Sequence, residues 1–565
     1  MKKNLQKLMS VGLAGAMAVS MVACGSSEQA PTTDAATTDV AATTENATAT
    51  DAVAGIDGFE AFADNVEIII PVYQRDTPNG AADAADNYWT KWVQSEFGDK
   101  YNVTVTYRAY HRGDENNLYA MDAAAGDLPS ICFEYDYPDV TLYQNEGYFQ
   151  TYDPEWFKQI APTYWAAMEE NGLDAYTDIN GETVLLIGTR PYGKTNYQFV
   201  TFYRADWAEA AGYDEYPLDP KDQDEMYAKI YDLGLCGDHI LGGSRVEGNG
   251  VDQNYAYRTY PQDDLLWATT GDYSIPALST EAQKGFLKRQ NHLYNLGYID
   301  DEYNTRTSDL AIADFVNGDC MTYSCYSTNN IDVLNQFYEN NPDGKLGIVV
   351  NPGVKEFSDG SNTAFRPNGI FGEYIGFSSS CSEDQMKAVA MYLEWMSQPD
   401  VLKTMQWGFE GKNYIVENGV MTSVADQSAI EEQQGHNNNV DMWCLVTATR
   451  SLGDVDADIK AIAPAGYPDS DELLKDIKAN YEGQLACYEG GYASPDCMFQ
   501  VSIAANDEYK DTLFSKYAEL RDMVVMGSEA DFEANYEKAS KEYLAAGYQA
   551  IIDEKTEAFN AGNYN

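Results

Sequence analysis

Positive charge, histidine and long apolar runs are all scarce in this chain. Asp and Glu number 90 against 36 Lys and Arg, so the formal net charge is -54, which excludes nucleic acid as a partner. The four histidines lie far apart and the nine cysteines form no zinc-binding pattern, so we expect no metal site and no cofactor. Beyond the N-terminus, no apolar run approaches the roughly 20 residues that span a bilayer. We therefore expect a soluble body.

Sequence patterns of common catalytic sites are missing as well. The chain has no Gly-x-Ser-x-Gly, no His-Glu-x-x-His and no Cys–His nucleophile arrangement. Asp454, Asp456 and Asp458 imitate the start of a calcium loop, but Ile459 and Ala465 replace the glycine and glutamate that such a loop requires. We therefore expect no catalytic residues and a protein that is not an enzyme. A glycan hydrolase is the alternative, because it needs only a pair of carboxylates.

The N-terminus reads as an export signal. Three lysines precede an apolar stretch from Leu8 to Val22, which is too short to span a bilayer. The sequence Met21-Val22-Ala23-Cys24 resembles a bacterial lipobox, in which the cysteine takes diacylglycerol. We therefore expect residues 1–23 to be a removed signal peptide and Cys24 to carry lipid. The protein would then be anchored at the outer face of the cell membrane.

The body of the chain is too long for one core, and its predicted parts follow a composition change. Residues 24–58 are rich in Ala, Thr and Asp and lack aromatic and basic residues, which predicts a disordered tether. Removing the signal leaves enough chain for two or three cores. We predict a first lobe from residues 59–190 and 372–440. Residues 191–371 and 441–565 would form a second lobe with C-terminal helices.

Strand and helix patterns alternate after the tether, which predicts an α/β fold. Strands are expected at 66–72, 103–107 and 130–133, with helices at 82–97 and 117–125 between them. This order predicts parallel pairing, with ligands bound beyond the carboxyl ends of the strands. The candidate ligand-binding residues at those ends are Tyr73, Arg75, Asp76, Glu134, Tyr135 and Asp136. Later elements are expected at 184–187, 222–233, 281–296, 374–377 and 384–397, and residues after 470 should be helical.

One segment matches the phosphate-loop pattern without its context. Gly188–Thr195 reads GTRPYGKT and follows a predicted strand. That pattern requires a helix to begin at the Lys-Thr, whereas residues 196–203, NYQFVTFY, are typical of a strand. We therefore do not expect a nucleotide site.

Three stretches together resemble the family 1 extracellular solute-binding proteins of ABC importers. They are residues 203–213, with Arg204-Ala205-Asp206-Trp207; residues 295–300 and 313–321; and residues 388–398 and 407–414, which end in Gly-Phe-Glu-Gly-Lys-Asn-Tyr. The resemblance implies a type II periplasmic-binding-protein fold, with two α/β lobes joined by crossing hinge strands. It also implies a ligand in the cleft, closure about the hinge and ABC permease subunits as partners. We expect the receptor itself to be a monomer.

Aromatic residues are abundant, with 43 Tyr and nine Trp, and they favour a carbohydrate ligand. Aromatic faces stack on the CH faces of sugar rings, while carboxylates and amides bind hydroxyl groups. We expect Trp89, Trp92 and Trp395 to pack in a core, because they lie on predicted helix faces. Further candidate ligand residues lie in loops or at strand ends: Trp267, Tyr326, Trp407 and Trp443.

Charged and sulfur-containing residues leave alternatives open. Arg75 and Arg190 lie near predicted strand ends and are each expected to form a structural ion pair. If one faces the cleft instead, the ligand could be an acidic sugar or a peptide, so peptide or other small-solute binding by the same fold is a second alternative. We expect the cysteines to be buried thiols, although Cys320 with Cys325 or Cys487 with Cys497 could pair.

Overall fold

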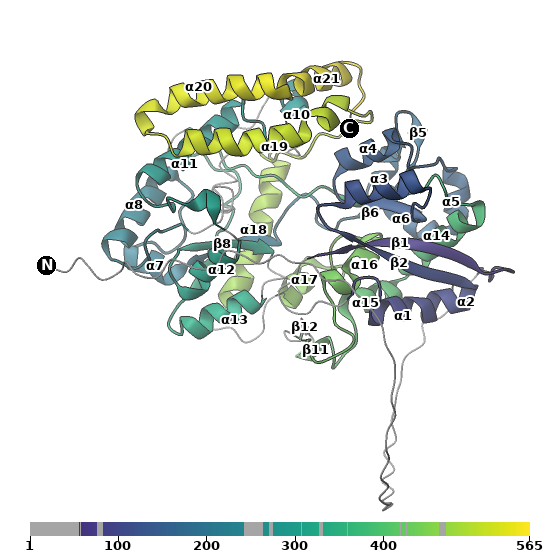
Figure 1. The fold of residues 1–565 in the computed structure, drawn as a ribbon. Coiled ribbons are helices and arrows are strands. Elements are labelled where there is room, and N and C mark those ends of the chain that lie inside the picture. Colours follow the sequence, from purple (N-terminus) through teal and green to yellow (C-terminus); the bar gives the residue numbers. More distant parts are fainter. Residues whose placement is uncertain are drawn as a thin grey trace, which may run out of the picture. The chain divides into compact units, whose positions relative to one another are not determined.

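The chain forms two lobes, each organised around its own hydrophobic packing (Figure 1). The computed structural model describes residues 56, 58–75, 83–241, 264–270, 275–306, 308–326, 331–358, 360–417, 420–424, 427–462 and 470–564. Lobe 1 is the part around one large core that draws on residues 66–187, 374–446 and Met498. Lobe 2 is the part around two further cores, which draw on residues 197–348 and 459–551. The boundaries predicted from the sequence stay a prediction.

Lobe 1 contains the predicted parallel strand pair. β1 (Val66–Gln74) and β2 (Val103–His111) pair in parallel from Val66 opposite Val103 to Gln74 opposite His111. The third predicted strand behaves differently. β3 (Ile131–Glu134) pairs antiparallel with β10 (Phe371–Phe377), which also pairs antiparallel with β6 (Leu185–Thr189). The predicted parallel sheet is therefore correct for two strands and wrong for the third, because local pattern does not reveal a partner more than 200 residues away.

Helices cover the strands of lobe 1, and α14 (Glu383–Met396), which contacts β1, has ten buried residues. Its N-terminus is capped, because the Ser382 side chain accepts a hydrogen bond from the Gln385 backbone N–H. Trp89 and Trp395 are fully buried and Trp92 packs against the same core, as predicted. The helices are α1 (Tyr88–Val93), α2 (Asp99–Tyr101), α3 (Glu115–Ala125), α4 (Tyr137–Asn145), α5 (Pro154–Ile160), α6 (Pro162–Glu170), α14 (Glu383–Met396), α15 (Pro399–Trp407) and α16 (Asp441–Cys444).

Among the described residues, the remaining strands outside lobe 2 form two hairpins. They are formed by β4 (Asp178–Ile179) with β5 (Glu182–Thr183) and by β11 (Tyr414–Glu417) with β12 (Val420–Ser423). 

Lobe 2 is divided by a three-stranded antiparallel sheet. β7 (Phe199–Arg204) lies between β8 (Thr322–Tyr326) and β9 (Leu346–Ile348). Side chains along a strand alternate between its two faces, so Val200 and Phe202 enter one core while Tyr203 enters the other. The sheet therefore has apolar packing on both faces.

The helices of lobe 2 include a long C-terminal group (yellow in Figure 1). α19 begins near lobe 1, where the Lys510 ammonium lies 2.8 Å from the Asp139 carboxylate of α4. The helices are α7 (Ala205–Ala211), α8 (Pro220–Asp232), α10 (Asp264–Thr270), α11 (Glu281–Asn295), α12 (Ser308–Asn317), α13 (Ile331–Asn340), α17 (Val455–Ile462), α18 (Ser470–Glu489), α19 (Ala504–Val525), α20 (Phe532–Tyr543) and α21 (Gln549–Asn560). The predicted helical character after residue 470 is confirmed.

Among the described segments that carry the chain between the cores of the two lobes are 189–199, 348–371 and 446–455, which we call the crossing segments. They are bonded to one another through their backbones. The N–H of Arg190 donates to the Ile370 carbonyl (2.9 Å), and the N–H of Thr189 donates to the Val446 carbonyl (2.9 Å). A Cβ at Gly193 would lie 2.6 Å from the Ile370 Cα, so only glycine fits this crossing without a shift.

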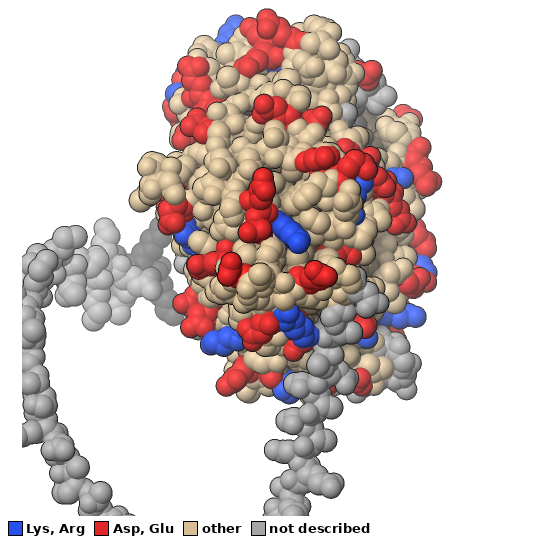
Figure 2. Space-filling model, turned by 90° about the vertical axis from the view of Figure 1, so that its right-hand side faces the viewer, with Lys and Arg blue, Asp and Glu red and all other residues tan. Residues whose placement is uncertain are grey.

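The described surface is charged, and the described cysteines form no disulfide. On the face shown in Figure 2, acidic side chains are spread over the surface with basic ones between them. No helix in the described part of the chain is long and apolar enough to cross a bilayer. None of the eight cysteines that the structure describes is in a disulfide, so Cys320 with Cys325 and Cys487 with Cys497 are not paired in that way.

Candidate functional site

A pocket of about 870 Å³ lies where the crossing segments meet the two lobes. Lobe 1 contributes residues around Tyr135 and Tyr374, and lobe 2 contributes residues around Val200 and Asn480. Between them lie residues 190–196 and 366–371 of the crossing segments. The volume falls in the range of roughly 300–1,000 Å³ that is usual for small-molecule sites. A ligand here would contact both lobes at once.

Aromatic rings form much of the pocket wall. The rings of Phe371 and Tyr374 lie 5.8 Å apart, and Tyr176 packs edge-on against Phe371 at 4.7 Å. Phe371 and Tyr374 lie on β10, whose register against β6 shifts between these two residues, and Tyr176 ends a short helix over Leu173–Tyr176. The aromatic lining residues are Tyr135, Tyr137, Tyr176, Phe199, Trp267, Phe357, Phe371, Tyr374, Tyr488, Phe499 and Phe514.

Amide side chains hold the crossing segments and line the pocket beside the rings. The Asn196 backbone N–H donates to the Gln484 side-chain oxygen (2.8 Å), and the Gln484 amide donates back to the Asn196 Oδ1 (2.7 Å). The Asn196 amide also donates to the Arg366 carbonyl (2.9 Å). These bonds tie α18 to two of the crossing segments. Other amides of the lining are Asn351, Asn368, Asn480 and Asn506.

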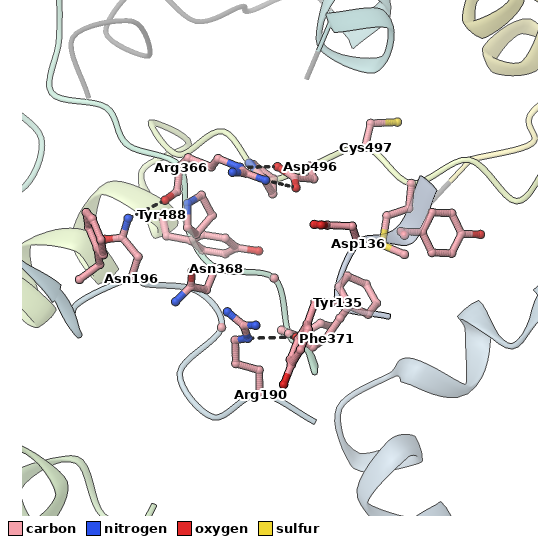
Figure 3. Close-up of a pocket in the computed structure, with 18 of the residues that line it drawn as sticks. Tyr135, Asp136, Arg190, Asn196, Arg366, Asn368, Phe371, Tyr488, Asp496 and Cys497 are labelled. Carbon is pink, nitrogen blue, oxygen red and sulfur yellow. Dashed lines mark hydrogen bonds and ion pairs between the residues drawn. The ribbon is translucent and has the colours of Figure 1, made fainter. Parts of the chain in front are cut away.

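Charged side chains of both signs reach the pocket. Among the described lining residues, the cations are Arg190, Arg366 and Lys510, and the anions are Asp136 and Asp496. Arg366 binds Asp496 through two hydrogen bonds, at 2.8 Å from Nε and 2.5 Å from Nη2. Figure 3 shows this pair on the side of the pocket opposite Arg190. The wall is therefore polar as well as aromatic.

Three of the predicted ligand residues line this pocket. Tyr135 and Asp136 directly follow β3, which fits the expectation that ligands lie beyond strand ends. Trp267 lies on α10, where its indole N–H donates to the Pro495 carbonyl (2.7 Å) and so fixes the ring. The structure brings these three side chains to one cavity although they come from both lobes.

Tyr73, Arg75 and Glu134 instead form a polar cluster with Arg112 and Asp441. The Asp441 carboxylate accepts two hydrogen bonds from Arg75 (2.8 and 3.0 Å), one from the Tyr73 backbone N–H (2.9 Å) and one from the hydroxyl of Tyr135 (3.0 Å). The expected structural ion pair of Arg75 is confirmed. The Glu134 carboxylate accepts hydrogen bonds from the Tyr73 hydroxyl (2.7 Å) and Arg112 (2.7 Å). These side chains support Tyr135 from behind and do not line the pocket.

Burial governs the protonation of the acids in and beside this polar cluster. Burial raises the pKa of Glu134 to about 7, although the Arg112 charge and the Tyr73 hydrogen bond oppose the shift. Glu373 on β10 is also fully buried, and neither of its carboxylate oxygens has a hydrogen-bond partner of good geometry. Burial, and then the nearby Asp441 charge, raise the pKa of Glu373 well above its usual range. The sequence did not predict a role for Glu373. Its environment depends on β3 and β6, which flank β10 and come from distant parts of the chain.

Trp407 and Trp443 lie in hydrophobic cores rather than among the pocket residues. Each is 4% exposed, Trp443 in the lobe 1 core and Trp407 in a small cluster with Tyr414. The sequence had suggested a loop or strand-end context for each. Trp407 lies on α15 and Trp443 lies on α16, and both are buried there. We therefore leave both out of the proposed site.

Other predicted positions fall outside what the structure describes. Asp76, the lipidation site Cys24 and nearly all of the tether lie outside the described residues. Tyr326 ends β8 opposite Phe199, but its side chain is likewise not described. Within the described chain, no group of three or more His, Cys, Asp or Glu side chains is placed to hold a metal ion.

The phosphate-loop-like segment has a structural role. It follows β6, as predicted, and leads through a turn into strand β7 rather than into a helix. Its Arg190 and Gly193 line the pocket. Tyr192 adopts a left-handed φ of 61°, which is strained for a non-glycine residue. The segment is therefore one of the crossings between the lobes and not a nucleotide site.

A family model described as bacterial extracellular solute-binding protein matches residues 92–433, which is more than half of the chain. The chain belongs to this family. The family resemblance seen in the sequence is thus confirmed, and the family consists of binding proteins. A search of curated proteins found no match.

Solved structures of similar fold extend over nearly the whole chain. An alginate-binding protein, AlgQ2, is 16% identical, with a TM-score of 0.58 over 89% of this chain and 99% of its own. An HMO-binding solute-binding protein from Bifidobacterium longum infantis is 14% identical, with a TM-score of 0.55 over 88% and 99%. An ABC-transporter substrate-binding protein from S. pneumoniae, in complex with kestose, is 14% identical, with a TM-score of 0.54 over 87% and 100%. The two-lobed binding-protein fold is therefore confirmed.

Proposed function

We propose that this protein is a lipid-anchored receptor that captures a mono- or oligosaccharide and delivers it to the permease of an ABC importer. The observation that carries the proposal is the composition of the pocket. Aromatic rings, amides and charged groups from both lobes line one cavity of about 870 Å³. Rings of this kind stack on sugars, and amides bind hydroxyl groups.

The position of the pocket supports a mechanism of closure about the hinge. A ligand favours a closed state only if it contacts both lobes, and this pocket is lined from both. The crossing segments are the expected hinge, because they join the two lobes and are bonded to one another through their backbones. The proposed ligand residues are Tyr135, Asp136, Trp267, Arg190, Asn368, Phe371, Tyr374 and Tyr488.

The similar solved structures also support a sugar ligand. One binds alginate, one binds HMO and one is in complex with kestose, and all three ligands are carbohydrates. The proposal does not depend on which of these sugars is bound. It requires only that flat rings and hydroxyl groups meet the aromatic and amide lining.

Isothermal titration calorimetry against a panel of glycans and peptides tests the ligand class. We expect saturable binding of at least one glycan, and mass spectrometry should recover that glycan unchanged after long incubation. Binding of peptides with no response to any glycan would overturn the carbohydrate assignment. Shortened glycans in the recovered material would show a hydrolase instead.

The anchor is tested separately from the pocket. We expect the Cys24→Ala variant to be released from the membrane, while the protein with Cys24 intact carries lipid at its N-terminal cysteine by mass spectrometry. Retention of the variant on the membrane would overturn the anchoring proposal and leave the ligand proposal standing. Sedimentation of the purified body should give the mass of a monomer.

A further inference from the structure

Arg190 is held in the pocket wall by its own backbone and by one guanidinium nitrogen. Its backbone N–H donates to the Ile370 carbonyl (2.9 Å), and its Nε donates to the Phe371 carbonyl (3.1 Å). No described residue accepts a hydrogen bond from either Nη of Arg190 or forms an ion pair with it. The two Nη groups of Arg190 are therefore held in place without a hydrogen-bond partner among the described residues.

The other charged side chains of the described pocket lining all lie next to an opposite charge. Arg366 binds Asp496, and Lys510 lies 2.8 Å from the Asp139 carboxylate. The Asp136 carboxylate lies 3.8 Å from Nη2 of Arg112. Arg190 differs from all of them.

The lack of an ion pair at Arg190 among the described residues is informative because the chain is so rich in acidic residues. The chain carries 90 acidic residues against 36 basic ones, so a carboxylate partner is easily supplied by the sequence. The pocket reverses this balance, because three cations and two anions line it in the described structure. A partly buried cation without a partner costs free energy, unless a ligand supplies the negative charge.

We propose that the ligand is an acidic oligosaccharide and that Arg190 binds the carboxylate of one of its uronic acid residues. The inference rests on the proposed sugar-binding function and narrows it. A guanidinium with two free Nη groups matches the two oxygens of a carboxylate. A single free cation suits one negative charge better than a phosphate, which carries about -1.5 to -2 at pH 7.

Neighbouring groups of the wall suit the rest of such a sugar. In Figure 3, Asn368 lies between Arg190 and the Arg366–Asp496 pair, and a dashed line joins Arg190 to Phe371, whose carbonyl accepts the Nε hydrogen bond. The Asn368 side chain is half-buried, and its backbone N–H donates to the Thr195 carbonyl (3.0 Å). An amide and an aromatic ring next to the arginine supply hydroxyl and ring contacts for the residue that carries the carboxylate.

Calorimetry with matched sugars tests the role of Arg190. The probes are galacturonate, glucuronate, mannuronate and guluronate trisaccharides, each beside its own methyl ester, and neutral trisaccharides. The esters keep the rings and linkages but remove the charge. We expect at least one free acid to bind about tenfold more tightly than its ester, and Arg190→Gln to remove that preference. Arg190→Lys, which keeps the charge but not the fork, should retain part of it.

The controls separate this inference from the proposed function. Lys91→Gln removes one exposed positive charge outside the pocket and should leave every affinity within about twofold. Thermal unfolding checks that each variant is folded. If acids and esters bind equally, or only neutral glycans bind, the inference is overturned while the sugar receptor stands. If Arg190→Gln weakens acid and ester alike, Arg190 binds hydroxyl groups and the inference is overturned. If no glycan binds, both proposals fall.

Discussion

The pocket wall and the polar cluster meet at Tyr135, yet they use charge in opposite ways. In the polar cluster, Asp441 accepts four hydrogen bonds and lies with its side chain 1% exposed. In the wall, Arg190 keeps both Nη groups without a protein partner among the described residues. Charges that satisfy one another stabilise the fold, whereas a charge left unsatisfied at a cavity is available for a ligand. The comparison separates residues that build the site from residues that we propose bind.

The largest expected effect is a loss of protein stability when a charge is removed from the polar cluster. Asp441→Asn leaves Arg75 without its counterion, so we expect the free energy of unfolding to fall by about 3–5 kcal/mol in urea titrations. The matched control is Asp86→Asn, which removes an exposed carboxylate 2.8 Å from Lys91 and should cost less than about 1 kcal/mol. Equal losses in the two variants would show that the polar cluster does not stabilise the fold.

A change in the wall should affect binding and spare stability. Tyr488→Ala removes a half-buried ring that lines the pocket. We expect about a tenfold loss of affinity for whichever glycan the calorimetric panel identifies, because stacking on the ring is lost. The unfolding midpoint should move little by comparison with Asp441→Asn. Unchanged affinity would remove Tyr488 from the proposed site.

A third effect is a change in the pH dependence of stability within the polar cluster. Because burial raises the pKa of Glu134 to about 7, from an ordinary value of 4.5, the folded protein holds this proton up to a higher pH than the unfolded chain. The contribution of Glu134 to stability is therefore present below about pH 4.5 and is lost as the pH rises towards 7. Glu134→Gln removes the titration, so the variant should gain stability relative to the native protein between pH 5 and about 8.

Urea unfolding of both proteins across this pH range measures the gain. Glu60→Gln, at an exposed position outside the polar cluster, serves as the control and should show a constant difference from the native protein. A constant difference for Glu134→Gln as well would contradict the raised pKa of Glu134.

Much of the fold could be predicted from the sequence because its signals are local. The β1 and β2 strands, the Ser382 cap and the C-terminal helices each follow from the spacing or type of nearby residues. The antiparallel partner of β3 could not be predicted in this way, since β10 lies far along the chain and nothing local specifies which strand it joins.

Strand ends predicted Tyr135 and Asp136 of the candidate site, while Trp267 was predicted from its loop-like sequence context. Tyr135 and Asp136 follow β3 directly, so the strand-end rule reaches them. The rule also selected Tyr73 and Glu134, but it does not tell a side chain that faces the cavity from one that supports the wall. Residues 366–371 carried no signal, because they enter the pocket through backbone pairing between crossing segments.

The chain passes repeatedly between the two lobes, and this affects how the protein folds during export. The core of lobe 1 needs side chains from Val66 through Val446, together with Met498, so no early stretch of the chain can complete it. During export, the first lobe would stay unfinished until most of the polypeptide has emerged outside the cell. Its exposed apolar strands would need protection from aggregation throughout that interval. Secretion of this protein should therefore be more sensitive to extracytoplasmic chaperones than that of a protein whose domains are continuous in sequence.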